Sequence, residues 1–333
     1  MPPAAPPVTP ERILQFAWGY APTLILEAAI CHHVFDVLDA RPMTVAQVAK
    51  ATGASVRGLT AIMNALVGLK FLAKAGQSYS LTPESAAFLV STKPGFQGGL
   101  LRHASSQLIP KWLEINRVVA TGKPAVSVNQ EEDGSDFFKE FVVDIFPMSY
   151  PSAQTLAKSL RLNIASVLDL AAGSGVWGIA LAQSSPHVRV TAVDWPDVIP
   201  TTKKSVARFN LSDRFTFVAG DLLSANFGTG HTVATLGHIL HSEGEQRSRK
   251  LLARVFKALA PGGTIAIAEF LVLADRTAPV GSLFFAVNML VNTDHGDTFS
   301  FEEISAWLTE AGFTNPRTVS APGPSPLVLA TKP

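Results

Sequence analysis

A glycine-rich turn between a short apolar strand and a helix is the feature that most constrains this chain. The segment 166–183 reads SVLDLAAGSGVWGIALAQ, and VRVTAVD follows it and ends at Asp194. Gly173 and Gly175 supply the positive φ and the missing Cβ that let backbone amides approach a ligand closely. Asp194, at the tip of the next strand, can accept hydrogen bonds from both hydroxyls of a ribose. The order of strand, turn, helix, strand and acid therefore predicts a nucleotide-cofactor site.

Two classes of cofactor fit this frame. Gly173, Gly175 and Gly178 match the G-x-G-x-x-G pattern of dinucleotide sites. However, Asp169 stands just before the glycines, where its charge would repel a pyrophosphate and attract a cation. S-adenosylmethionine carries an ammonium and a sulfonium group and has no phosphate. We therefore expect S-adenosylmethionine, and a dinucleotide is the alternative.

The composition favours a two-domain protein with a small-molecule partner. Over 333 residues, 47% are hydrophobic and 16% charged, which predicts extensive buried surface. The formal charge of +1 gives no global field for nucleic acid or an anionic membrane. Cys31 is the single cysteine, no metal-ligand spacing occurs, and no secretory signal is visible, so we expect a cytoplasmic protein without a metal. The proline-rich start MPPAAPPVTPER predicts a loose tail.

Residues 13–30 are apolar but too short and too interrupted, by Gln15, Pro22 and Glu27, for a membrane span. We interpret them as a pair of helices buried between two copies of the chain, which predicts a homodimer formed through the N-terminal domain.

Residues 42–82 have the pattern of a winged-helix unit, with two short helices and a strand pair around 75–77. Thr44 and Ser55 are predicted N-caps. One apolar face of the second helix is predicted core: Leu59, Ile62, Met63, Leu66 and Leu69. DNA binding is the alternative function for such a unit, but the helix 55–69 offers only Arg57 as a cation, and phosphate neutralisation needs several.

From Ser166 onward, strands and helices alternate, which predicts an α/β fold with a doubly wound parallel sheet. The strands read VLDL, RVTAVD, FTFVAGD, TVATLGH and TIAIAEF, with a closing strand near LVLATK. Gly262 and Gly263 are predicted to end a helix and start the fifth strand. Ser242 and Glu245 fit a capping box. The expected domains are 1–95 for dimerisation, 96–160 as a helical linker that contributes to the acceptor pocket, and 161–333 for catalysis.

Ionisable residues follow five successive strands, and ligands of open α/β sheets bind beyond the carboxyl ends of the strands. These residues are Asp169, Asp194, Asp221, His241 and Glu269. Asp221 can accept a hydrogen bond from an adenine amine, or can simply cap a helix. His241 can take a proton from a hydroxyl, and Glu269 can orient its imidazole. The alternative for His241 is a histidine that only satisfies its own loop.

Aromatic residues between 95 and 160 are mostly expected in the core, although a few can line a pocket for a flat, apolar substrate. They are Trp112, Phe137, Phe138, Phe141 and Phe146, with Met148 beside them.

From about Glu11 to Lys332, the chain resembles the small-molecule O-methyltransferases of the caffeate and acetylserotonin type. The resemblance rests on VLDLAAGSG, VDWPDVI, AGDLL, HILH and PGGTIAIAE, which stand in the order of that family's motifs. It implies a Rossmann-like methyltransferase sheet and an N-terminal dimerisation domain. It also implies transfer of a methyl group from S-adenosylmethionine, leaving S-adenosylhomocysteine, to a hydroxyl of a small aromatic molecule.

The resemblance also implies roles for individual residues. His241 matches the base that deprotonates the acceptor, and Glu269 flanks it. The positions matched to the cofactor site are Asp169, Ala171, Gly173, Gly175, Asp194, Trp195, Asp221 and Leu222. Those expected to contact the acceptor are Met148, Met289, Asn292 and Phe138.

The chain departs from the family's pattern mainly on the acceptor side. The first glycine of the turn is Ala171, and the lysine four residues before the base is Gly237. The usual His-Asp-Trp becomes His241, Ser242, Glu243, and the second flanking glutamate is Thr298, with Asp294 and Asp297 as possible substitutes. These changes leave C-methylation, or a reaction other than methylation, as alternatives.

Overall fold

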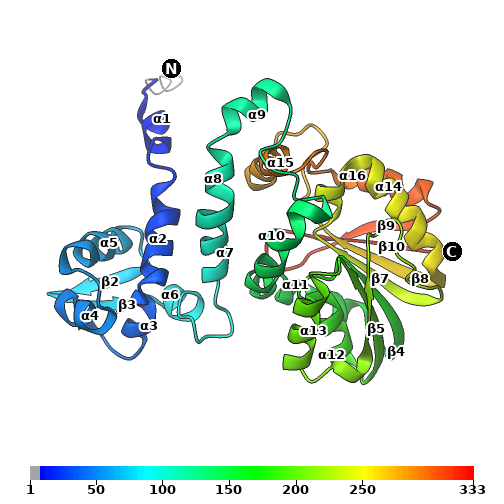
Figure 1. Cartoon of the computed structure of the whole chain (residues 1–333), viewed down its shortest axis with the longest axis horizontal. Helices are drawn as coiled ribbons and strands as arrows, with labels where there is room; N and C mark the ends of the chain where they lie inside the picture. The colour runs from blue at the N-terminus through cyan, green and yellow to red at the C-terminus, as the bar shows by residue number, and fades with distance from the viewer. Residues whose placement is uncertain (1–7) are drawn as a thin grey trace, which may run out of the picture. The chain divides into compact units, whose positions relative to one another are not determined.

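The computed structural model describes residues 8–333, apart from the side chains of Asp136, Lys139, Glu140 and Ile164. Two compact units divide between Gln107 and Leu108, and each is described by itself (Figure 1). Most of the proline-rich start, residues 1–7, lies outside the described residues. The prediction of a loose tail is wrong for Glu11 and Arg12, which form the first turn of helix α1.

The first unit is mostly helical and contains the predicted helix pair and hairpin. Thr44 accepts a hydrogen bond from the Gln47 amide and forms a full capping box, and Ser55 caps the next helix, as predicted. Of the predicted core face, Leu59, Met63 and Leu66 are buried. The remaining two residues of that face are half-buried. The elements are α1 (Glu11–Phe16), α2 (Ala21–Cys31), α3 (Val34–Asp39), β1 (Met43–Thr44), α4 (Val45–Thr52), α5 (Val56–Gly68), β2 (Leu72–Ala75), β3 (Ser78–Leu81), α6 (Pro83–Phe88), α7 (Gly98–His103) and the π-helical η1 (Ala104–Leu108).

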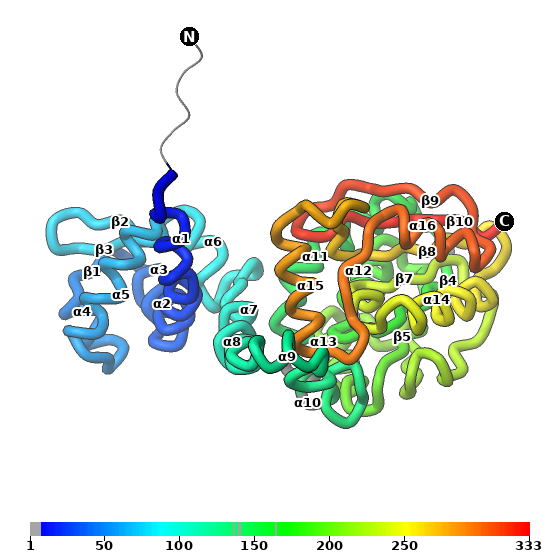
Figure 2. Tube along the Cα trace, turned by 90° about the horizontal axis from the view of Figure 1, so that it is seen from above, coloured from blue at the N-terminus to red at the C-terminus, as the bar shows by residue number. Residues whose placement is uncertain are grey.

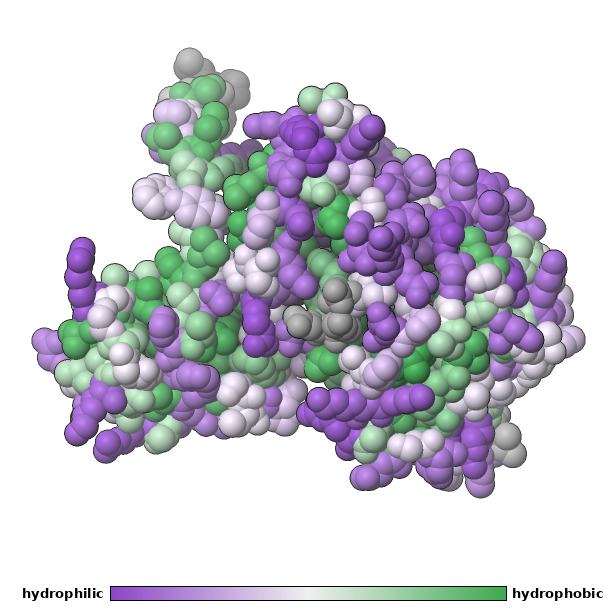
Figure 3. Space-filling model, in the orientation of Figure 1, coloured by the Kyte–Doolittle hydropathy of each residue, from purple (hydrophilic) through white to green (hydrophobic). Residues whose placement is uncertain are grey.

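Helix α1 and the turn after it expose apolar side chains. Ile13 is 75% exposed, Phe16 68% and Trp18 70%. Figure 3 shows hydrophobic residues gathered along this part of the chain. Among the described residues, Glu11–Cys31 is the one helical stretch that meets the length and composition of a membrane span. Neighbouring large apolar side chains that are exposed in this way usually mark an interaction site.

The second unit is built on a seven-stranded sheet that is mostly parallel. The strand order is β6-β5-β4-β7-β8-β10-β9, and the first five strands run parallel. The α/β prediction is confirmed, but β10 runs antiparallel to both of its neighbours. The apolar run LVLAT of β10 does not indicate whether the strand runs parallel or antiparallel to its neighbours. Strand β9 was not predicted from the sequence. The strands are β4 (Ile164–Leu170), β5 (His187–Asp194), β6 (Phe215–Ala219), β7 (His231–Gly237), β8 (Leu259–Ala268), β9 (Thr314–Val319) and β10 (Leu327–Thr331).

Helices cover both faces of this sheet and enclose one apolar core on each side (Figures 1 and 2). One face carries α11 (Phe146–Leu160), α12 (Val176–Ser184) and α13 (Ile199–Arg208). The other carries α14 (Leu240–Ala258) and α16 (Phe301–Glu310). Helix α15 (Val280–Asn292) packs against α8 (Ile109–Trp112) and α9 (Ile115–Thr121). The remaining elements are α10 (Glu131–Asp144) and the 3₁₀ turn η2 (Ser212–Arg214).

Two local predictions around α14 are wrong. The helix begins at Leu240, so Ser242 and Glu245 lie inside it rather than at a capping box, and a kink with φ 71° at Gly244 separates them. At the other end, the helix stops at Ala258, so the pair Gly262 and Gly263 lies within β8 instead of capping the helix. The Gly262 amide donates to the Lys332 carbonyl, which draws this segment into the sheet.

Gly178 has a packing role that a substitution can test. A Cβ at this position would lie 2.8 Å from Asp169 Oδ2 and 2.8 Å from Val190 Cγ1, because α12 approaches β4 and β5 closely. We expect Gly178→Ala to lower the free energy of unfolding by about 1–3 kcal/mol, measured by urea denaturation.

Gly281→Ala in α15 is the matched control, since a Cβ added there would meet no atom within 4 Å and its φ is not positive. It should change stability by less than about 1 kcal/mol. Equal effects of the two substitutions would argue against close packing at Gly178.

Candidate active site

The five predicted ionisable residues gather at the carboxyl ends of five adjacent strands. Asp169 is the next-to-last residue of β4 and Asp194 the last residue of β5, while Asp221 follows β6. His241 lies in the first turn of α14, after β7, and Glu269 directly follows β8. Because these strands are parallel neighbours, one edge of the sheet carries all five residues, as ligand sites of open α/β sheets do.

The glycine turn is closed by Asp194. Its Oδ2 accepts a hydrogen bond from the Gly173 amide at 2.7 Å, and its Oδ1 accepts one from the Trp195 amide at 2.7 Å. Gly173 and Gly175 have φ of 54° and 75°, as the pattern requires, and Ala171 also takes a positive φ, of 50°. The methyl group of Ala171 is therefore held in a left-handed conformation that a glycine adopts more easily.

Asp169 is bonded to α12 and to the neighbouring strand β7. It is fully buried, and its Oδ2 accepts from the Gly178 amide at 2.9 Å while its Oδ1 accepts from the Thr235 hydroxyl at 2.7 Å. Burial raises the pKa of Asp169 to about 7, although both hydrogen bonds act in the opposite direction. These two bonds hold the start of α12 on the sheet, and a contact of Asp169 with the cofactor stays a prediction.

The turn fits a nucleoside cofactor. Each oxygen of the Asp194 carboxylate accepts one amide hydrogen and keeps a lone pair for a ribose hydroxyl. Burial raises the pKa of Asp194 to about 6. The ring of Phe138, which is expected at the acceptor, lies 6.0 Å from the ring of Trp195, which is expected at the cofactor.

The Asp221 carboxylate is engaged on both oxygens. Oδ1 accepts from the Leu223 amide at 2.9 Å, and Oδ2 pairs with Arg247 at 2.7 Å. Arg247 also pairs with buried Glu243 at 2.6 Å, and burial raises the pKa of Glu243 against the lowering effect of that arginine. Arg247 therefore ties the loop of Asp221 and buried Leu222 to the first turn of α14.

Glu269 holds both His241 and the start of its helix. Glu269 Oε2 lies 2.7 Å from His241 Nδ1, and Oε1 accepts from the amides of Leu240 at 2.7 Å and His241 at 3.3 Å. Burial would raise the pKa of Glu269, but the charges and hydrogen bonds of His241, with the charge of His238, lower it below its ordinary value. The carboxylate accepts from Nδ1, so the neutral imidazole carries its lone pair on Nε2.

Aromatic rings surround this imidazole. Phe285 from α15 meets His241 edge to face, with ring centroids 4.8 Å apart, and Phe270 lies 5.9 Å from it. Phe270 and Phe285 stack on each other at 4.1 Å. Neither phenylalanine stood out in the sequence, because no local pattern marks a ring that turns toward a distant strand end.

Sequence reasoning also missed His238 and Trp177. The ring of His238 lies 5.1 Å from Phe270 and 6.3 Å from Trp177. A Cβ on Gly237 would lie 1.9 Å from Trp177 Nε1, so the indole fills the space that a side chain at residue 237 would need. This is a steric reason for glycine at the position where the resemblance leads one to expect lysine.

The expected acceptor residues are distributed over three helices, with Phe138 on α10. Met289 and Asn292 are buried on α15, and Met148 is half-buried on α11. Asn292 Nδ2 donates to Asn288 Oδ1 at 3.1 Å, and Trp112 Nε1 donates to the same oxygen at 2.9 Å. These bonds fix α15 against α8.

Three residues are predicted as replacements for the family's second glutamate, and Glu269 is the carboxylate that pairs with the His241 imidazole. Thr298 is buried, and its hydroxyl has no hydrogen-bond partner among the described residues. Asp294 accepts from Ser127 at 2.8 Å, and Asp297 pairs with Arg276 at 3.3 Å. Both aspartates are thus engaged with other groups. In the described part of the chain, no cluster of three or more His, Cys, Asp or Glu residues could hold a metal ion.

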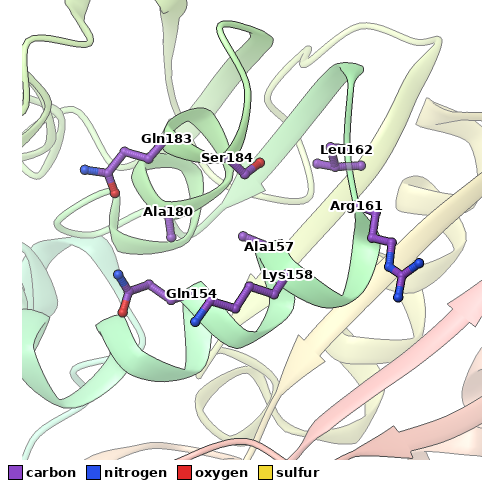
Figure 4. Close-up of a pocket in the computed structure, with 8 residues that line it drawn as sticks. All are labelled: Gln154, Ala157, Lys158, Arg161, Leu162, Ala180, Gln183 and Ser184. Carbon is purple, nitrogen blue, oxygen red and sulfur yellow. The ribbon is translucent and has the colours of Figure 1, made fainter.

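A separate hollow of about 390 Å³ lies between α11 and α12 (Figure 4). Its lining includes Arg161 and Leu162, just before β4, and Ser184 at the end of α12. These residues mark the amino ends of the strands, opposite the edge that carries the five ionisable residues. We therefore assign it no part in the candidate site.

The glycine turn, the strand-end acids and the mostly parallel sheet with β10 inserted antiparallel define a nucleoside-dependent transferase of the methyltransferase fold. Residues 119–314 match the O-methyltransferase domain, and residues 14–91 match the O-methyltransferase dimerisation domain. The chain belongs to this family of O-methyltransferases, whose methyl donor is S-adenosylmethionine.

Curated relatives and solved structures agree with this assignment. A 3-hydroxy-5-methyl-1-naphthoate 3-O-methyltransferase of Streptomyces sahachiroi is 31% identical over 97% of this chain and 95% of its own. The tetracenomycin polyketide synthesis 8-O-methyl transferase of Streptomyces glaucescens is 28% identical, over 97% of each chain. The structure of a putative O-methyltransferase from Nostoc punctiforme, 25% identical, superimposes with a TM-score of 0.91 over 98% of this chain and 100% of its own.

The raised pKa of Asp169 predicts a pH dependence of stability. Its carboxyl group binds a proton more tightly in the folded state, with a pKa of about 7, than at its ordinary value of 3.8. The free energy of unfolding should therefore fall as the pH rises between these two values, by up to about 1.4 kcal/mol per pH unit. Asp169→Asn removes this titration and keeps an acceptor for the Gly178 amide.

Urea denaturation of both proteins without cofactor, at pH 5 and pH 7.5, measures the effect. The stability of the wild type relative to Asp169→Asn should be lower at the higher pH. A difference that stays constant across this range would contradict the raised pKa.

Proposed function

We propose that this enzyme methylates a hydroxyl of a small aromatic molecule, with His241 as the general base. The observation that carries the proposal is the 2.7 Å contact between His241 Nδ1 and buried Glu269, within a set of aromatic rings. This contact leaves Nε2 as the free acceptor, and a neutral imidazole can take a proton near neutral pH.

The chain's own residues would bind and align the reactants. S-adenosylmethionine, when bound, supplies an electrophilic methyl group on a sulfonium. Asp194 would hold its ribose, and the turn of Gly173 and Gly175 would allow close approach of the backbone. His241 Nε2 would accept the hydroxyl proton while the oxygen attacks, and Glu269 would stabilise the resulting imidazolium. Much of the rate enhancement would come from alignment within a dry pocket.

An aromatic acceptor is supported by the rings around His241. Phe270 and Phe285 are stacked with ring centroids 4.1 Å apart, and both are half-buried, so their remaining exposed parts offer apolar surface for a planar molecule. The name of the Streptomyces sahachiroi relative gives a hydroxynaphthoate as that enzyme's acceptor. The chemistry of the site thus favours a flat phenolic compound.

Two substitutions should separate the base from the cofactor site. His241→Ala should lower kcat by about 100-fold or more and leave the affinity for S-adenosylhomocysteine within about two-fold of the wild type. Asp194→Ala should weaken that affinity by about ten-fold or more, because it removes the expected ribose contacts. Isothermal titration measures the affinity, and product mass measures methyl transfer.

Either of two results would contradict these roles. One is near-wild-type turnover of His241→Ala on every phenolic acceptor that the wild type methylates. The other is unchanged cofactor affinity of Asp194→Ala in a variant whose circular dichroism is that of the wild type. A product methylated on carbon would move the assignment to the alternative reaction.

We also propose that two copies of the chain pair through the first unit. The exposed apolar residues Leu14, Phe16 and Trp18 belong to the segment that matches the dimerisation domain, and Ile13 directly precedes it. Burying them against a second copy would remove from water an apolar surface that a soluble monomer rarely exposes. The partner that fits this surface is the same surface of another copy, since closed two-fold pairing is the commonest form of oligomer.

A charge placed in this surface should break the pairing. We expect Phe16→Asp to shift the mass in sedimentation equilibrium from a dimer toward a monomer. Val56→Asp is the control, because Val56 is also exposed, on α5 of the same unit. A wild-type protein that is monomeric at micromolar concentration, or a Phe16→Asp variant that remains fully dimeric, would overturn the proposal.

A further inference from the structure

His238 is held in an unusual backbone conformation beside the base. It follows the last residue of β7, and its φ is 61°, a left-handed value that is uncommon for residues other than glycine. Its amide donates to the Ala268 carbonyl at 2.9 Å, which anchors it to the end of β8. Strained backbone of this kind often occurs at functional sites.

The ring of His238 is fixed by its aromatic neighbours. Phe270 lies 5.1 Å away, Trp177 6.3 Å and His241 6.4 Å, measured between ring centroids. The absence of a side chain at Gly237 provides the room that Trp177 occupies. Two imidazoles therefore lie in one cluster of rings, and only one of them is engaged by Glu269.

The two nitrogens of His238 differ in their surroundings. Nδ1 is buried and has no hydrogen-bond partner among the described residues, whereas the residue as a whole is only half-buried. Burial lowers the pKa of His238 to about 4, although the charge of Glu269 acts in the opposite direction. The ring is thus neutral at physiological pH and carries one proton. An N–H on Nδ1 would be a buried donor without an acceptor, so the proton belongs on Nε2.

We propose that His238 is a second acceptor-binding residue, whose Nε2–H donates a hydrogen bond to a carbonyl or carboxylate oxygen beside the hydroxyl that is methylated. This inference rests on the proposed function and narrows its substrate class. His241 accepts a proton at one oxygen while His238 donates to the other, so the two imidazoles have complementary roles. The 6.4 Å between their rings suits two oxygens on one ring or on fused rings.

This arrangement has a chemical advantage for such acceptors. In a hydroxyl compound with a neighbouring carbonyl, the hydroxyl proton forms an internal hydrogen bond and is harder to remove. A donor from His238 to the carbonyl replaces that internal bond and frees the proton for His241. His238 would therefore determine specificity, since a site built to bond a substrate oxygen discriminates strongly against an analogue that lacks it.

Nitrogen-15 NMR of the histidine side chains tests the tautomer without any acceptor. We expect His238 to carry its proton on Nε2 and to show no titration between pH 5 and pH 8, with His238→Asn used to assign its signals. A proton on Nδ1, or a titration near pH 6.5, would overturn the inference.

Binding of matched probes tests the contact itself. With S-adenosylhomocysteine saturating, the wild type should bind 1-hydroxyanthraquinone at least about ten-fold more tightly than 1-hydroxyanthracene, which lacks the neighbouring carbonyl. His238→Asn should abolish this preference, because its amide reaches only the position of Nδ1. Asparagine tolerates the left-handed conformation, so backbone strain does not explain such a loss. His238→Gln, whose amide reaches the position of Nε2, should retain part of the preference.

The outcomes separate this inference from the proposed function. If the wild type binds neither probe, or binds both equally, the role of His238 is wrong even when other phenols are methylated. The same conclusion follows if His238→Asn keeps the preference. If the wild type instead binds S-adenosylhomocysteine but methylates no phenolic hydroxyl, the proposed function fails, and the expected tautomer of His238 can still be observed by NMR.

Discussion

The carboxylate of Glu269 is the interaction on which the arrangement of the acceptor side depends. One oxygen accepts from the first amides of α14, and the other accepts from the imidazole of His241. Glu269 directly follows β8, which lies between β7 and β10, so its position is fixed by the sheet. The imidazole of His241 is consequently placed by backbone pairing across three strands, although it lies in a helix that follows a different strand.

Asp194 and Asp169 likewise hold separate segments together by accepting hydrogen bonds around the glycine turn. Asp194 accepts from two amides of the loops that it joins, and Asp169 connects α12 with β7 through Gly178 and Thr235. Each acid therefore satisfies backbone or hydroxyl donors that burial would otherwise leave unpaired. Acids at strand ends can build the loops of a site as well as contact its ligands, and the bonds of Asp169 to Gly178 and Thr235 belong to the first role.

The sequence was sufficient to predict the α/β fold, the glycine turn and the strand ends, because these follow from local patterns and from one rule about parallel sheets. It could not reveal what each side chain contacts. Trp177 and Gly237 are sixty positions apart in the chain, and their fit is purely steric. Similarly, the kink with positive φ at Gly244 separates the two residues of the predicted capping box. The apolar pattern of β10 also does not show that the strand runs antiparallel to β8.

The departures that the resemblance implies are concentrated around His241. Residue 237 is glycine, and the indole of Trp177 fills the space that a side chain there would need. Residue 298 is a buried threonine. If the family has a lysine and a glutamate at these positions, both changes remove a charge. In the proposed acceptor site, polar recognition would then come from neutral groups, and the ring of His238, packed against Phe270, would be the neutral donor. A pocket with the His241–Glu269 pair, a neutral imidazole and stacked phenylalanines would suit a planar molecule whose oxygens are its only polar atoms.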